Sequence, residues 1–222
     1  MKRVIFLALC LCLVAATLTA CAKAPAPAPT PSAPTQSSQP QRPTEDKVLT
    51  AKGCPPIPQP LQQLYLDSQE MAAAFALCHF TTDGVTRQIG NQTYDVISDP
   101  RFPTYQALED YLNELFTQDY VAAVFLNPTG PVQKSADGLA CAIQASGVSD
   151  VTYAGHVFRV DQETDTKIQL TATVYYAEND RAGEPFFTVP QNPQDYTTTE
   201  MAFTFVNSQD GWRMSACPYI QQ

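Results

Sequence analysis

The chain has 222 residues, of which 44% are hydrophobic, enough apolar side chain to build a folded core. It carries 13 Lys or Arg against 22 Asp or Glu, a formal net charge of −9 at pH 7. This acidic balance excludes attraction to nucleic acid or to anionic lipid through surface charge, and no nucleic-acid partner is predicted.

The first twenty residues have the pattern of a signal peptide. Lys2 and Arg3 precede the apolar run 4–16, which is too short to span a membrane comfortably. The run ends in the sequence LTAC at 18–21, which matches a bacterial lipobox and implies cleavage before Cys21 and acylation of that residue with palmitate-type chains. We expect an extracytoplasmic protein that its N-terminal lipid anchors to the outer face of the bacterial cell membrane. The alternatives are an ordinary secretory signal cleaved nearby and an uncleaved anchor.

Residues 21–53 are predicted to be a tether, made of the lipidated Cys21 and a Pro-rich disordered segment. The run AKAPAPAPTPSAPTQSSQPQRPTEDK at 22–47 alternates Pro with small or polar residues and has almost nothing to bury. Such a segment favours the extended polyproline II conformation, so it can hold a domain up to ~100 Å from the membrane.

Residues 54–222 are predicted to form a single globular domain. Their seven basic and twenty acidic residues give a net charge of −13. That charge keeps an exported domain soluble and favours a basic partner.

Helices open the predicted domain. Pro60 suits a first helical turn, and apolar residues then recur at helical spacing as far as residue 78. Thr104 is a suitable N-cap for a second helix, and Thr117 for a short third one. The residues that share the apolar faces of the first two helices are Leu61, Leu64, Tyr65, Ser68, Met71, Ala72, Phe75 and Cys78, and then Tyr105, Leu108, Tyr111, Leu112, Leu115 and Phe116.

From residue 138 the apolar period becomes two, which is typical of strands. The predicted strands cover residues 139–144, 151–160, 167–177, 199–206 and 212–216, after one short strand at 94–97. Residues 207–211 are predicted to form the last hairpin turn. Helices followed by antiparallel strands indicate an α+β fold, in which N-terminal helices pack on a curved antiparallel sheet in a cystatin-like or NTF2-like arrangement.

Four cysteines remain besides the signal peptide and Cys21: Cys54, Cys78, Cys141 and Cys217. An even number in an extracytoplasmic domain predicts up to two disulfide bonds, with three pairings open. The spacings include no CxxC, so neither a zinc site nor a redox motif is predicted, and no cofactor is expected.

The residues argue against catalysis. His79 and His156 are the only histidines, and neither belongs to a metal-binding motif. No GxSxG or phosphate-binding loop is present, and adjacency alone does not make Cys78 and His79 a catalytic pair, because neighbouring side chains point in different directions. A hydrolase would require one of the histidines beside a free cysteine in a cleft. We therefore predict that the protein is not an enzyme.

Acidic residues cluster in two places. Glu109, Asp110 and Glu114 fall on the polar side of the second predicted helix, and Asp161 to Asp165 fall in a predicted hairpin. The second cluster lacks the central Gly and closing Glu of a calcium-binding loop. Both clusters are predicted to be solvated surface.

Three short segments carry a resemblance to a known family. They are Tyr111-Leu112 with Phe116-Thr117 and Tyr120, then Asp137-Gly138-Leu139, and finally Gly211-Trp212-Arg213-Met214-Ser215. Over roughly residues 61–217 the chain resembles the D,L-endopeptidase inhibitors, the IseA-like proteins. Proteins of that family are exported by Gram-positive bacteria and bind NlpC/P60-type peptidoglycan hydrolases, blocking the cleft that cuts wall stem peptides. The resemblance implies an inhibitor whose partner is a cell-wall hydrolase.

Residues 81–103 and 127–137 are expected to be the contacting loops of such an inhibitor, because their Pro and Gly content stiffens a projecting surface. The alternative is an NTF2-like accessory lipoprotein that binds a small ligand or a cell-envelope component. In that case the ligand would occupy a pocket between the helices and the curved sheet.

Overall fold

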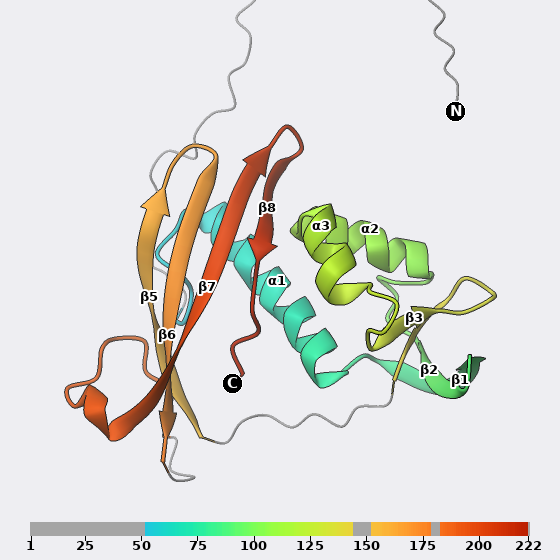
Figure 1. The fold of residues 1–222 in the computed structure, drawn as a ribbon, viewed down its shortest axis with the longest axis horizontal. Coiled ribbons are helices and arrows are strands. Elements are labelled where there is room, and N and C mark those ends of the chain that lie inside the picture. Colours follow the sequence, from blue (N-terminus) through green and yellow to red (C-terminus); the bar gives the residue numbers. More distant parts are fainter. Residues whose placement is uncertain (1–51, 144–151, 179–182, 222) are drawn as a thin grey trace, which may run out of the picture. The chain divides into compact units, whose positions relative to one another are not determined.

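The computed structural model describes residues 52–143, 152–178 and 183–221, which all belong to one compact unit (Figure 1). The predicted signal peptide, Cys21 and the predicted tether as far as residue 51 lie outside the described residues. The helices are α1 (Gln59–Leu77), α2 (Tyr105–Leu115), α3 (Gln118–Tyr120), η1 (Val121–Phe125) and η2 (Pro193–Asp195). The strands are β1 (Thr82–Ile89), β2 (Gln92–Ile97), β3 (Val132–Lys134), β4 (Ala140–Ala142), β5 (Tyr153–Glu163), β6 (Lys167–Ala177), β7 (Tyr196–Ser208) and β8 (Gly211–Ala216).

The predicted α+β class is confirmed, but the strands form two sheets rather than one. Both sheets are four-stranded and antiparallel, with the orders β1-β2-β4-β3 and β5-β6-β7-β8. The sequence predicted β2 and β4 but missed β1 and β3. These two strands are the edges of the smaller sheet, and β1 is polar and exposed, so it lacks the apolar alternation that marks a half-buried strand.

Helix α1 begins and ends as its sequence predicts. Pro60 lies in the first turn, where its missing N–H costs nothing, and the buried face includes Leu61, Met71 and Phe75. The helix ends at Cys78, whose backbone is left-handed with φ 52° and whose N–H bonds to the carbonyl of Ala74. A non-glycine residue in that conformation destabilises the fold by about 1 kcal/mol, and the hydrogen bond that ends the helix offsets this strain.

The larger sheet packs against α1 through aromatic rings. The ring of Tyr65 makes edge contacts with Phe158 of β5, at 5.6 Å between centroids, and with Phe203 of β7, at 5.8 Å. Apolar side chains of β6 alternate into the same core. Side chains therefore fill the space between α1 and this sheet at Tyr65.

Helix α2 joins the two sheets. Thr104 caps it as predicted, since its hydroxyl accepts a hydrogen bond from the N–H of Ala107 at 3.1 Å. The helix contacts β4 of the smaller sheet and β8 of the larger one, and Leu108 and Leu112 are fully buried between them. No described helix is both long enough and apolar enough to cross a membrane.

Candidate functional site

The β1–β2 hairpin is exposed along most of its length. From residue 81 to 93 every residue is exposed except Arg87 and Ile89, which are half-buried. Burial begins only at Tyr94, where β2 enters the smaller sheet. A two-stranded ribbon in water is marginally stable, so other contacts must hold this one in place.

The hairpin closes in a tight two-residue turn. Ile89 pairs with Gln92, and the turn residue Gly90 has φ 61°, a conformation that costs glycine nothing. Across the next pair, the Gln88 side-chain amide donates to the hydroxyl of Thr93 at 2.5 Å. The tip is therefore locally ordered without a hydrophobic core.

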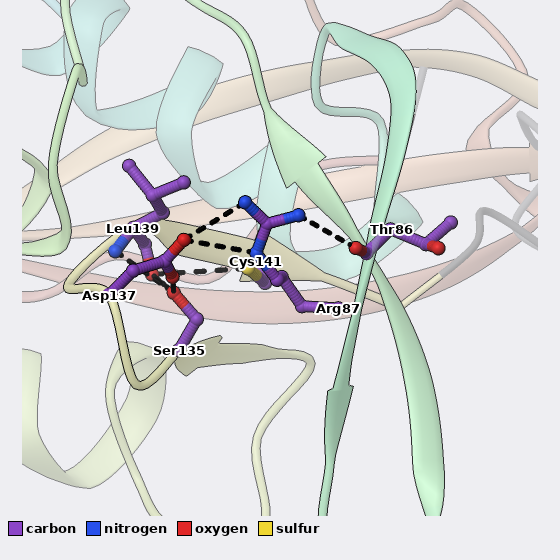
Figure 2. A network of polar contacts seen from close by, with 6 residues as sticks. All are labelled: Thr86, Arg87, Ser135, Asp137, Leu139 and Cys141. Carbon is purple, nitrogen blue, oxygen red and sulfur yellow. Dashed lines mark hydrogen bonds and ion pairs between the residues drawn. The ribbon is translucent and has the colours of Figure 1, made fainter.

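An ion pair braces the hairpin against the β3–β4 turn (Figure 2). The Arg87 guanidinium donates to Oδ2 of Asp137 through Nε at 3.1 Å and through Nη2 at 2.9 Å. Its remaining nitrogen Nη1 donates to the carbonyl of Thr86 at 2.9 Å. One side chain thus links two segments that lie fifty residues apart in the sequence.

The β3–β4 turn holds the carboxylate ready for this pair. Ser135 is buried, and its hydroxyl donates to Asp137 Oδ1 at 2.5 Å while accepting from the N–H of Leu139 at 3.0 Å. Gly138 has φ 82°, which permits the tight turn. The hydrogen bond from Arg87, and then that from Ser135, hold the pKa of the Asp137 carboxyl below its ordinary value. The carboxylate is therefore charged at any pH at which the domain is expected to work.

The two stretches predicted to be contacting loops are brought together by this brace. Residues 81–103 contain β1 and β2, so most of that stretch is a hairpin and not a loop. Residues 127–137 contain β3 and end at Asp137 itself. The role of these residues in contacting a partner stays a prediction, and the pairing of Arg87 with Asp137 could not be read from the sequence.

The imidazole of His156 lies in a second polar site. Its side chain is almost fully buried, with Nδ1 2.6 Å from the hydroxyl of Tyr153 and Nε2 2.9 Å from the carbonyl of Gly53. Because a carbonyl only accepts, Nε2 carries the proton and Nδ1 accepts from Tyr153. Burial lowers the pKa of His156, which favours the neutral ring. A cavity of about 380 Å³ beside this site is lined by Lys52, Gly53, Cys54, Pro56, His156, Val157, Phe158 and Phe187.

A histidine and a free cysteine therefore line one cavity, the arrangement that a hydrolase would need. The contacts argue against such a role, because both ring nitrogens of His156 are already engaged by Tyr153 and Gly53. Burial also raises the pKa of the Cys54 thiol, which disfavours the reactive thiolate. The imidazole instead holds Gly53, near the start of the described residues, against β5.

His79 and Cys78 line another cavity, of about 320 Å³, with Asp95 and Ala142. The Cys78 thiol donates to the carbonyl of Phe75 at 3.8 Å, and burial raises its pKa. Among the described residues, no hydrogen bond joins a histidine nitrogen to a cysteine sulfur. Cys78 and His79 are neighbours in the sequence, but the Cys78 thiol is bonded to the backbone and its raised pKa disfavours the reactive thiolate.

The four cysteines expected to form disulfide bonds, Cys54, Cys78, Cys141 and Cys217, are all free thiols in the structure. This differs from the expectation of up to two bridges. Cys141 pairs with Val96 across β4 and β2 and shares its face of the sheet, whereas the neighbouring Ala142 lines the cavity with Cys78 on the other face. The smaller sheet therefore separates Cys141 from Cys78.

Cys54 and Cys217 belong to the main core instead. Burial raises the pKa of Cys217 to about 12, and its sulfur accepts a hydrogen bond from the Gln69 amide at 3.1 Å. Both thiols are therefore held in the unreactive protonated form at neutral pH.

The acidic clusters lie at the surface. Asp110 accepts a hydrogen bond from Gln106 one helical turn earlier, and Asp161 of β5 accepts from Arg159 at 2.7 Å and from Thr171 at 2.5 Å. Among the described residues, no three His, Cys, Asp or Glu side chains are grouped so that they could hold a metal ion.

Comparison of the sequence with models of known protein families and with curated proteins gives no match.

Proposed function

We propose that the protein is a membrane-anchored extracytoplasmic lipoprotein whose domain binds and inhibits a peptidoglycan D,L-endopeptidase of the NlpC/P60 type. It does so by covering the active-site cleft of that hydrolase. The observation that carries the proposal is the braced β1–β2 hairpin, which is ordered although residues 81–93 bury almost nothing.

A hairpin without buried apolar surface contributes little to the stability of its own domain. The chain nevertheless holds it in one conformation with the Arg87–Asp137 pair and the cross-strand bond of Gln88 to Thr93. Such preorganisation lowers the entropic cost of docking on a partner. A projecting, preorganised ribbon is what a protein needs if it acts by the shape of its surface.

The contacts of the histidines support a binding role over catalysis. In the cavity that His156 and Cys54 line, the imidazole holds the backbone at Gly53. In the cavity that His79 and Cys78 line, the thiol bonds to the carbonyl of Phe75. The domain's charge of −13 suits attraction to a hydrolase with a basic surface around its cleft.

Two of the three segments that carry the family resemblance meet in the fold, since the carbonyl of Met214 accepts a hydrogen bond from the N–H of Thr117 at 3.0 Å. The third segment contacts the start of α2, where the carbonyl of Gly138 accepts from the N–H of Tyr105 at 2.9 Å. A shared architecture with the IseA-like inhibitors is part of this proposal. The finer arrangement that we propose is cystatin-like or NTF2-like, with α1 packed on the β5–β8 sheet.

The test is an inhibition assay. The soluble chain from residue 22 onward, and the full lipidated chain in detergent, are titrated into each NlpC/P60-type hydrolase of the same organism while release of wall fragments is measured. We expect stoichiometric inhibition of at least one hydrolase. Unchanged fragment release with every hydrolase would refute the proposed function.

A second candidate function follows from the cavity beside His156. Its volume of about 380 Å³ and its lining by Phe158 and Phe187 fit a small ligand, as in an NTF2-like accessory lipoprotein that binds a cell-envelope component. A ligand there would raise the midpoint of thermal unfolding of the chain. An H156Q variant that kept the whole of that rise would remove the cavity from consideration.

A further inference from the structure

We propose that the tip of the β1–β2 hairpin, residues 88–93, is the element that enters the partner's cleft. The surface that receives it is a narrow groove suited to an uncharged, extended peptide backbone. This inference rests on the proposed function and adds the docking element and the chemistry of its target.

The tip carries no charge although its domain is strongly acidic. Residues 88–93 are Gln-Ile-Gly-Asn-Gln-Thr, with no ionisable side chain, in a domain of net charge −13. Burying a carboxylate in a protein cleft without a partner is costly, whereas a side-chain amide can exchange its bonds with water for bonds with peptide groups. The uncharged tip can therefore be desolvated in a groove that already binds peptide.

Two backbone groups of β1 already have side-chain hydrogen-bond partners. The backbone N–H of Val85 bonds to the carboxylate of Asp83 at 3.0 Å, and the carbonyl of Thr86 bonds to the Arg87 guanidinium at 2.9 Å. The pairing of β1 with β2 is also interrupted between Thr82 and Thr86. Side-chain caps and a bulge of this kind prevent another strand from pairing along an edge. These features oppose strand addition along β1, so we assign docking to the tip.

The tip is also shaped before it binds. The Tyr94 hydroxyl donates to Oε1 of Gln92 at 3.2 Å, and Gln88 donates to Thr93 on the opposite side. Tyr94 itself is anchored among the buried residues of the smaller sheet. The amides of Gln88 and Gln92 are therefore held in set directions, which favours specific hydrogen bonds over loose contact.

The test inserts one negative charge at the tip without changing its shape. Gln92→Glu keeps an oxygen that accepts from Tyr94, so the conformation of the tip is retained and only the charge differs. The matched control is Gln209→Glu, which adds the same charge to the exposed turn between β7 and β8. Wild type and both variants of the chain are compared as inhibitors of the NlpC/P60-type hydrolase that the wild type inhibits, and their thermal unfolding is recorded.

We expect Gln92→Glu to weaken inhibition by at least about tenfold, because the new carboxylate must be desolvated in the groove. Gln209→Glu should inhibit like the wild type, and all three proteins should unfold at nearly the same temperature. If Gln92→Glu inhibits as well as Gln209→Glu, or if both lose potency equally, the tip does not enter the cleft although the inhibitory function stands. If the wild type itself inhibits no hydrolase, the proposed function fails, and the docking element assigned to it fails with it.

Discussion

At the scale of single residues, His156 shows how burial decides the use of a titratable side chain. Its two ring nitrogens are engaged by Tyr153 and by the carbonyl of Gly53, and no carboxylate is among these partners. Two other titratable side chains line this cavity, Lys52 and the buried thiol of Cys54. Both belong to the segment that precedes α1. The imidazole therefore serves as a neutral hydrogen-bonding link between the start of the domain and β5.

This link predicts a loss of stability in mild acid. The pKa of His156 is lowered in the folded state, so the unfolded chain takes up a proton at a higher pH, near 6.5 by the ordinary histidine value. The stabilisation that the neutral imidazole contributes should be complete above about pH 6.5. The free energy of unfolding should then fall as the pH drops toward the folded-state pKa of His156. Urea unfolding of the wild type between pH 7.5 and pH 5 measures the slope.

The H156Q variant isolates this effect. It should lose about 1–3 kcal/mol of stability at pH 7, because Gln replaces the paired imidazole imperfectly, and it should show a shallower pH slope than the wild type. The exposed His79 is the control, and H79Q should keep the wild-type slope. An H156Q slope equal to that of the wild type would contradict the assignment.

At the scale of elements, the Arg87–Asp137 pair decides whether the hairpin is rigid. Both side chains are partly exposed, so the pair is screened by solvent and should contribute little to the global stability. Its effect should instead be local, because it fixes β1 to the β3–β4 turn.

Removing the pair should therefore loosen the hairpin without unfolding the domain. In D137N we expect amide hydrogen exchange at residues 86–89 to become severalfold faster, while the midpoint of thermal unfolding stays nearly unchanged. Exchange in β6, which belongs to the other sheet, provides the internal reference. Unaltered exchange at residues 86–89 would show that the β1–β2 ladder alone holds the hairpin.

At the scale of the whole molecule, the domain has a net charge of −13 but an uncharged tip. We therefore expect salt to affect the association rate and the dissociation rate of the complex differently. Long-range attraction to a basic hydrolase should speed association, and salt should slow it by roughly tenfold between 50 and 500 mM NaCl. Dissociation depends on the desolvated tip, so its rate should change little. Kinetic binding measurements across this range test both statements, and salt-dependent dissociation with constant association would contradict them.

The sequence predicted the elements whose signals are local. Strand β6 has the bounds that the alternation of residues 167–177 predicts, and α2 begins after Thr104 as its capping side chain predicts. Both predictions rest on interactions between residues close in the sequence. The alternation of apolar side chains marks β6, and the cap that satisfies a backbone N–H group marks the start of α2. The α+β class followed from the order of these elements.

What the sequence by itself determined is therefore the acidic composition, the main helices and the long half-buried strands, while export and lipid anchoring stay predictions. Only the tertiary structure decided that the strands form two sheets, that Arg87 meets Asp137, that His156 holds Gly53 and that a sheet separates Cys141 from Cys78. The reason is that edge strand β1 is held by backbone pairing, which leaves no apolar period. A contact between residues fifty or a hundred positions apart leaves no trace in either local sequence.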